Sequence, residues 1–406
     1  MTVPRCASAW LLLFSFSAAE MLAQEWTEAQ VIEKFLDQSP YTREARARVD
    51  SVRADAAGRV LLPNPTAIAT REGAGYAAFF QLEQQLPISG RRGFLKQAGA
   101  AAVGVTEAQA AMTLWTLRSD VRLGFYRLLA AQLRENALAD GMHDIDEVIR
   151  VLRAREKEGE GSRYDRLRAE REMAEYRSQL ALAHSDTVQA RAALSAFLPP
   201  GTAVDRAVGV LDTLAALPAI DLLVQRALSH RSEYIAEQRQ IDRFRLEQRA
   251  AERLKIPEPM AIAGIKRGDV APGRTETSSA VGITIPLPIF NKGQTEVARW
   301  RAEQEGATAR RDTLERRIRA EVTGAAEALR VRKSAVEQYR TEVNQTGVDL
   351  NRIVRVAYQE GEVGILELLD SYRITRQALL RLVDLEALAK ESQIDLDRAV
   401  GEEVLP

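Results

Sequence analysis

The chain has almost no cysteine: Cys6 is the only one in 406 residues. A metal or redox site of the Cys-x-x-Cys type is therefore excluded. Long hydrophobic runs are missing too, because no stretch after the N-terminus reaches 18 uninterrupted apolar residues, and no transmembrane helix is predicted. Lys plus Arg (56) nearly equals Asp plus Glu (57), so no strong net charge favours nucleic acid as a partner.

The N-terminal 24 residues have the pattern of a secretory signal peptide. Arg5 precedes an apolar run from Ala7 to Ala19, and small residues follow to about Gln24. A lipoprotein signal would need a cysteine directly after the apolar run, whereas Cys6 precedes it. The sequence thus predicts that residues 1–24 are removed on export. The alternative is a buried N-terminal helix.

Proline and glycine are sparse, with 14 and 24 residues, while 46% of the chain is hydrophobic and 28% is charged. This composition is typical of long amphipathic helices. No proline interrupts about 91–198 or about 292–400, and apolar residues in both segments recur every three or four positions. We expect each segment to form a long antiparallel helical hairpin, with turns near Gly159 and Gly361. A soluble coiled-coil rod is the alternative.

The sequence contains an internal duplication. Four landmarks recur in the same order about 200 residues apart. They pair Val31, Phe35 and Tyr41 with Val224, Leu228 and Tyr234; Pro63 and Pro65 with Pro257 and Pro259; Leu86-Pro87-Ile88 with Leu287-Pro288-Ile289; and Glu158-Gly159-Glu160 with Glu360-Gly361-Glu362. The two copies span about 25–200 and 217–400. The second is longer between its prolines and its Leu-Pro-Ile, so we expect an exposed loop at about 266–279.

Each copy begins with a helix, predicted at about 27–60 and 217–254, that ends before the paired prolines. Two stretches of alternating apolar and polar residues follow, which predicts strands at about 65–72 and 76–86 in the first copy, and at about 259–266 and 280–288 in the second. Such strands fit either a half-buried soluble sheet or a tilted crossing of a bilayer.

Four strands cannot close a barrel, and an open sheet edge in lipid would leave backbone groups unpaired. Three chains would supply twelve strands, an even number within the range of outer-membrane barrels, and would align six hairpins below them. The predicted fold is therefore mainly α with a small β part. Two repeats of a strand pair plus a long hairpin build a trimeric 12-stranded barrel, which a helical tube continues.

Two stretches resemble the TolC family of outer-membrane efflux proteins. The first, Gly282 to Asn291 with Gly293 and Gln294, is similar to the CzcC-like branch, which serves heavy-metal efflux pumps of the RND type. The second runs from Tyr358 to Val363 and continues with Leu366 to Asp370. The resemblance implies a homotrimer in the cell outer membrane, with its helical tube in the periplasm. It also implies docking to a periplasmic adaptor (membrane fusion protein) and an RND-type inner-membrane pump.

The expected function is that of the outer-membrane channel component of a tripartite efflux system, a passive exit duct for solutes that could include metal cations. Two alternatives stay open: a periplasmic adaptor, or a coiled-coil structural protein of the same export system. Adaptors carry one helical hairpin, whereas this sequence predicts two. A structural rod would have no use for alternating strands.

The resemblance also indicates site residues. Acidic side chains narrow the periplasmic end in this family, and Glu367 and Asp370 fall at that place, three residues apart on one helix face. Asp165 is their counterpart in the first copy, where Arg168 replaces the second carboxylate. Ordinary solvated helix charges are the alternative. The adaptor-docking candidates lie at the two turns, which are otherwise plain helix reversals: Gly159, Glu160, Gly361 and Glu362.

Catalysis finds little support in the sequence. The three histidines, His143, His184 and His230, are scattered, and there is no His-Glu-x-x-His motif and no phosphate-binding glycine loop. We predict that the protein is not an enzyme and has no metal site and no cofactor.

Overall fold

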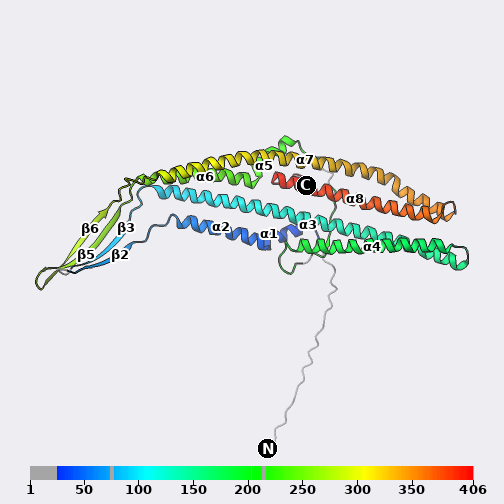
Figure 1. The fold of residues 1–406 in the computed structure, drawn as a ribbon, viewed down its shortest axis with the longest axis horizontal. Helices are drawn as coiled ribbons and strands as arrows, with labels where there is room; N and C mark the ends of the chain where they lie inside the picture. Colours follow the sequence, from blue (N-terminus) through cyan, green and yellow to red (C-terminus); the bar gives the residue numbers. More distant parts are fainter. Residues whose placement is uncertain (1–24, 74–76, 203, 213–215, 406) are drawn as a thin grey trace, which may run out of the picture.

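The computed structural model describes residues 25–73, 77–202, 204–212 and 216–405, without the side chains of 343–349. The predicted signal peptide, residues 1–24, lies outside these residues, and so does Tyr76 at the start of a predicted strand. The helices run along one elongated rod that has a sheet at one end and two helix turns at the other (Figure 1).

Apart from the two-residue strands β1 (Glu25–Trp26) and β4 (Arg206–Ala207), which pair with each other, the two halves of the chain have the same order of elements. The first half contains α1 (Glu28–Gln38), α2 (Pro40–Gly58), β2 (Thr66–Glu72), β3 (Ala77–Gln85), α3 (Arg91–Glu158) and α4 (Arg163–Ser195). The second contains α5 (Ile220–His230), α6 (Ser232–Glu252), a short 3-10 turn (Arg253–Lys255), β5 (Met260–Ala271), β6 (Arg274–Thr284), α7 (Gln294–Gln359) and α8 (Ile365–Val400). The predicted fold class, mainly α with two strand pairs that each precede a long hairpin, is confirmed.

The second strand pair is longer than predicted. β5 and β6 continue through the segment expected to be a loop at about 266–279, and their pairing reaches Ala271 and Arg274. The reversal needs only Pro272 and Gly273, and Gly273 has a φ of 78°. The loop prediction was wrong because charged residues do not exclude an exposed strand: Arg267 and Asp269 stand in register with Thr277 and Thr275 of the facing strand.

The first helix of each copy is broken, where the sequence predicted one helix. Ser39 is extended, with a ψ of 142°, and Pro40 opens α2. The residue before proline disfavours the helical region, and the Ser39 side chain accepts a hydrogen bond from the Tyr41 amide at 3.3 Å as the cap of the new helix. Arg231 makes the corresponding break between α5 and α6 without a proline.

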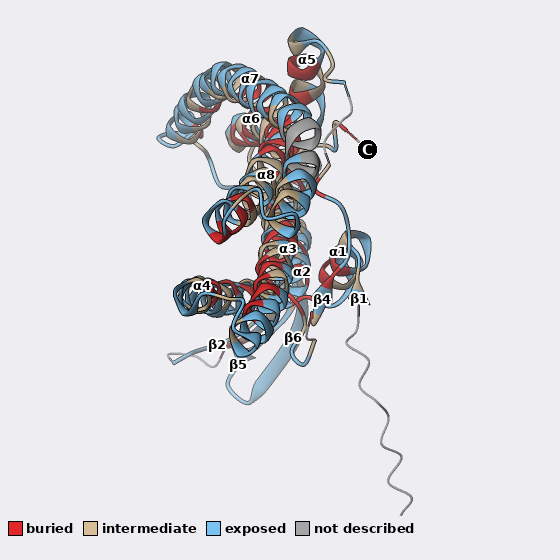
Figure 2. Cartoon of the chain, turned by 90° about the vertical axis from the view of Figure 1, so that its right-hand side faces the viewer, coloured by how far each residue is buried: buried red, intermediate tan, exposed pale blue. Residues whose placement is uncertain are grey.

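Helix α3 is the central element of the rod. At 68 residues it would extend about 100 Å. It packs on α2 and α6 toward the sheet, and on α4 and α8 toward the helix turns. The buried positions lie where these helices meet (Figure 2). Among the described residues, no helix is both long enough and apolar enough to cross a membrane.

Candidate pore gate and docking tips

The register of the four-stranded sheet gives it one apolar face. Directly paired residues of antiparallel strands project from the same side. We define the apolar face by its two central rows, which are Ala67, Leu82, Ala263 and Val281, and next to them Ala69, Phe80, Ile265 and Ser279. Val281 is 87% exposed and Phe80 is 54% exposed. Large apolar side chains therefore cover this face without protein packed over them in the single chain.

The opposite face of the sheet is largely polar. Its rows hold Gln81, Glu83 and Gln85 of β3 together with Thr66 and Thr70 of β2, interspersed with the apolar Ile68, Phe79 and Ile262. A sheet with one exposed apolar face and one polar face suits an interface between lipid and water.

Both edges of the sheet and of the helical layer are open in the described part of the chain. The strand order is β2-β3-β5-β6, so β2 and β6 each have one unpaired side. Toward the helix turns, α3 packs against α4 and α8, and α8 against α7, which leaves α4 and α7 at the margins. The marginal helices carry exposed apolar side chains: Leu182 on α4 and Val331 on α7 are each 66% exposed.

The two helix turns are the same structural motif and lie at the same end of the rod (Figure 1). Gly159 has a φ of 80° and Gly361 a φ of 77°, a left-handed conformation that glycine adopts without strain. In the first turn, the Glu160 amide donates to the Arg155 carbonyl at 2.9 Å. In the second, the Glu362 amide donates to the Ala357 carbonyl at 2.8 Å. These bonds define Schellman caps, and all four predicted docking residues are exposed.

Just past the second turn, α8 separates its buried and exposed faces. Ile365, Leu368 and Leu369 are buried, whereas Glu367 and Asp370 are exposed. The structure thus places both predicted gate carboxylates on the outer surface of α8, near one end of the rod. Asp370 is 50% exposed and forms an ion pair with Arg373, one turn further along.

Helix α4 contributes two more charges beside the gate candidates. Arg168 and Glu172 line a shallow cavity together with Glu367, Asp370 and Arg373. We call these five residues the gate cluster; it holds three carboxylates and two guanidiniums. Arg168 also donates to the Tyr164 hydroxyl at 3.0 Å. The sequence did not single out Glu172 or Arg373, although their spacing of four and three residues from Arg168 and Asp370 was a usable signal.

The third predicted gate residue, Asp165, does not line this cavity. It is half-buried and lies near Tyr358 of α7. Burial raises the pKa of the Tyr358 hydroxyl, and the Asp165 charge acts in the same direction, while Arg155 opposes them. The structure therefore brings Glu367 and Asp370 together with Arg168 and separates Asp165 from them.

No protein-family model matches the chain. Its sequence is 24% identical over 366 residues to the cobalt-zinc-cadmium resistance protein CzcC of Cupriavidus metallidurans, which covers 88% of this chain and 85% of that protein. Its structure is similar to the CmeC outer membrane channel of Campylobacter jejuni, with a TM-score of 0.73, 13% identity and coverage of 93% and 86% of the two chains. The chain therefore shares the fold of this channel.

A second solved structure supports this fold. The open state of the MtrE outer membrane channel of Neisseria gonorrhoeae has a TM-score of 0.71 with this chain, at 17% identity and with coverage of 93% and 89%. The resemblance to the CzcC-like branch, predicted from a short stretch of sequence, agrees with the 24% identity to CzcC over 366 residues, and the predicted TolC-like fold is confirmed.

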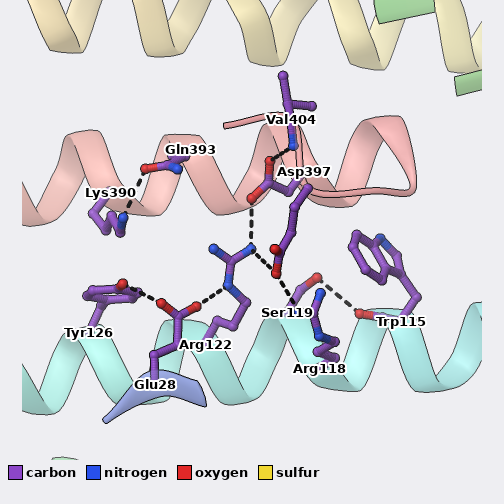
Figure 3. A network of polar contacts seen from close by, with 11 residues as sticks. Glu28, Trp115, Arg118, Ser119, Arg122, Tyr126, Lys390, Gln393, Asp397 and Val404 are labelled. Atoms are coloured by element: carbon purple, nitrogen blue, oxygen red, sulfur yellow. Dashed lines mark hydrogen bonds and ion pairs between the residues drawn. The ribbon is translucent and has the colours of Figure 1, made fainter. Parts of the chain in front are cut away.

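Midway along the rod, the chain contains a buried polar cluster that its sequence did not reveal (Figure 3). We call it the buried joint and define it as Glu28, Arg122, Tyr126, Lys390 and Asp397. Arg122 of α3 is 5% exposed and binds Asp397 of α8, which is fully buried, at 2.7 Å. Arg122 also pairs with Glu28 at the start of α1, which accepts a second hydrogen bond from the Tyr126 hydroxyl. The joint ties three helices together.

Burial dominates the acid-base properties of the joint. It raises the pKa of the Tyr126 hydroxyl, and it lowers the pKa of the Lys390 ammonium, which lies 4.8 Å from the centre of the Tyr126 ring. Burial also raises the pKa of Asp397, while the Val404 amide at 2.8 Å and Arg122 act in the opposite direction. Through the Val404 bond, the joint also holds the C-terminal residues against α8.

The three histidines lie on different parts of the surface. Each faces a carboxylate: His143 lies 3.8 Å from Glu147, His184 2.8 Å from Glu135, and His230 3.6 Å from Glu402. Among the residues that the structure describes, no group of three or more histidine, cysteine or acidic side chains could hold a metal ion.

Proposed function

We propose that this chain is the outer-membrane channel component of a tripartite efflux system, a passive exit duct for solutes that an inner-membrane pump delivers. One observation carries the proposal: a sheet with an exposed apolar face and two unpaired edges extends from the end of a long helical rod. In lipid, unpaired strand edges cost several kcal/mol for each unsatisfied group, so the sheet needs partner strands.

A ring of three copies satisfies this requirement. The free edge of β6 would pair with β2 of the next copy, which gives a closed barrel of twelve strands. The open margins formed by α4 and α7, with their exposed Leu182 and Val331, would meet in the same ring. The apolar face then meets lipid in the cell outer membrane, the polar face lines the pore, and the helices continue the pore as a tube into the periplasm.

The turn tips and the gate cluster have roles in this assembly. We infer that Gly159, Glu160, Gly361 and Glu362, exposed at the far end of the tube, contact a periplasmic adaptor that connects to an RND-type pump. Three gate clusters would surround the pore with a mixture of carboxylates and guanidiniums, which favours cations without excluding closure. Because CzcC is a cobalt-zinc-cadmium resistance protein, we propose metal cations as one class of solute.

The proposal is tested by comparing two adjacent positions on opposite faces of β3. Leu82→Asp introduces a charge on the apolar face, which is expected to destabilise the folded channel if that face meets the middle of a bilayer. Gln81→Asp introduces the same charge on the polar face. We expect the wild type and Gln81→Asp to be extracted from outer membranes as a heat-modifiable trimer that conducts ions in planar bilayers, and Leu82→Asp to insert poorly. A freely soluble periplasmic wild type would contradict the proposal.

A further inference from the structure

Two arginines, Arg71 and Arg267, lie on the apolar face of the sheet at the end furthest from the helices. The register pairs Arg71 of β2 with Ala78 of β3, and Ala78 with Arg267 of β5. This row follows directly after the row that contains Phe80, on the same face. With neighbouring strands about 4.8 Å apart, the two arginine backbones are roughly 10 Å from each other. Alanine stands between them, so no bulky side chain separates the two guanidiniums.

Other charged groups near this row have different positions or partners. Arg274, at the turn, pairs with Glu276 at 2.7 Å. Lys266 projects from the polar face and lies 5.0 Å from the centre of the Phe79 ring. Asp269 is on the apolar face, but it accepts a hydrogen bond from the Thr275 hydroxyl at 2.8 Å within its own hairpin. Arg71 and Arg267 are both exposed, and Arg71 also interacts within the chain.

We propose that Arg71 and Arg267 form a binding site for the phosphate groups of membrane lipids, which rests on the proposed function. A long cationic side chain at the border of an apolar surface lays its methylenes on that surface and places its charge at the level of the headgroups. The planar guanidinium matches phosphate oxygens and binds them through two parallel hydrogen bonds. In a ring of three copies, three such pairs surround the barrel at the leaflet that its strand turns face.

If this site binds lipid phosphates, the purified full-length protein should bind lipids with an exposed phosphate group in preference to lipids without net charge. The probe is phosphatidic acid, compared with phosphatidylcholine, which carries no net charge; native mass spectrometry counts each lipid bound to the protein in detergent. Arg71→Gln and Arg267→Gln should each weaken binding of phosphatidic acid about fivefold, since one cationic side chain near an anionic surface contributes about 1 kcal/mol. Lys266→Gln is the matched control, because it removes the same charge from the next residue on the other face.

The expected result is that wild type and Lys266→Gln prefer phosphatidic acid, that the double arginine variant loses the preference, and that free inorganic phosphate at the same concentration does not displace the lipid. Retention of phosphatidic acid by the double variant at the wild-type level would overturn the lipid site, and so would displacement by inorganic phosphate. Bilayer conductance keeps the two proposals apart. Conducting channels without lipid preference refute only the lipid site, whereas a wild type that forms no channels refutes the proposed function as well.

Discussion

The buried joint and the gate cluster consist of the same kinds of side chain in opposite environments. In the joint, Arg122 and Asp397 are 5% and 0% exposed. In the gate cluster, the side chains of Asp370 and Arg373 are 50% and 55% exposed. Removing one residue of a buried ion pair leaves the other residue's charge buried without a partner, whereas the residues of an exposed pair can interact with water instead of each other. The first arrangement fixes helices, and the second can change partners at little cost.

Both clusters include residues of α8, one near each end. Asp370 and Asp397 are separated by about 40 Å at 1.5 Å per residue. Helix α8 is therefore anchored to α1 and α3 at its C-terminal end and carries exchangeable charges at the end next to the turn. This difference suits a helix whose tip moves about a fixed base.

The largest expected loss of stability comes from removing the Asp397 carboxylate from the buried joint. Asp397→Ala should destabilise the protein by about 3–5 kcal/mol, because it leaves the buried Arg122 charge without its buried partner, with Glu28 and the more distant Glu403, at 4.0 Å, left to pair with. Asp370→Ala, the same change at an exposed position of the same helix, should cost less than about 1 kcal/mol. The measurement is denaturant unfolding at one fixed protein concentration. Equal losses in the two variants would contradict the contrast between the clusters.

A double-mutant cycle sharpens the same comparison. Removing Arg122 and Asp397 together should cost less than the sum of the single changes, with a coupling of about 1–3 kcal/mol, since the second truncation removes a charge that the first had stranded. The corresponding cycle for Asp370 and Arg373 should give roughly 0.3–0.5 kcal/mol, typical of an exposed pair within one helix. A larger coupling energy for Asp370 and Arg373 than for Arg122 and Asp397 would contradict the contrast between the gate cluster and the buried joint.

A smaller loss of stability is expected from a substitution in the second helix turn. Gly361→Ala forces a side chain into the left-handed conformation and should cost about 1–2 kcal/mol. Gly93→Ala is the control, because Gly93 has no positive φ and a methyl group there would meet nothing within 4 Å. Thermal unfolding distinguishes the two; a Gly361→Ala variant as stable as wild type would show that the Schellman cap is not needed at the turn.

The gate cluster should affect conductance more than stability. Replacing Glu367 by Gln and Asp370 by Asn keeps the side-chain sizes and removes two negative charges, so the preference for cations over anions should fall. Arg373→Gln removes the partner of Asp370 and should shift the preference toward cations. The permeability ratio in planar bilayers measures both, and shifts in the same direction, or none, would rule out this cluster as the gate.

The sequence predicted the features that depend on local pattern. The period of the strands, the long proline-free hairpins and the glycine turns were recognisable because each follows from neighbouring residues, as with Phe80 and Leu82 in β3. The length of β5 and β6 was missed because Lys266 and Asp269 looked like loop residues, although a sheet in contact with water tolerates charge. The helix break at Ser39 lay next to Pro40 and could have been predicted.

The buried joint could not be predicted from the sequence. Its partners Glu28, Arg122 and Asp397 come from distant parts of the chain, and each is an ordinary charged residue within an amphipathic helix. Only the packing of α1, α3 and α8 brings them together. The same limit applies to the gate cluster, where the position of Arg168 beside Asp370 depends on how α4 and α8 approach each other.

The central claim is that separate copies of this chain close one barrel by pairing β6 with β2, and engineered cysteines test it directly. Cys6 is the only native cysteine. Ala67→Cys in β2 would be combined in turn with cysteines at Ser279, Val281 and Ile283 of β6. Within one chain, Ala67 and Val281 are three strands apart, roughly 15 Å, which is too far for a disulfide. Oxidised outer membranes should then show disulfide-linked dimers and trimers for at least one combination, whereas monomers alone from all three would contradict the account.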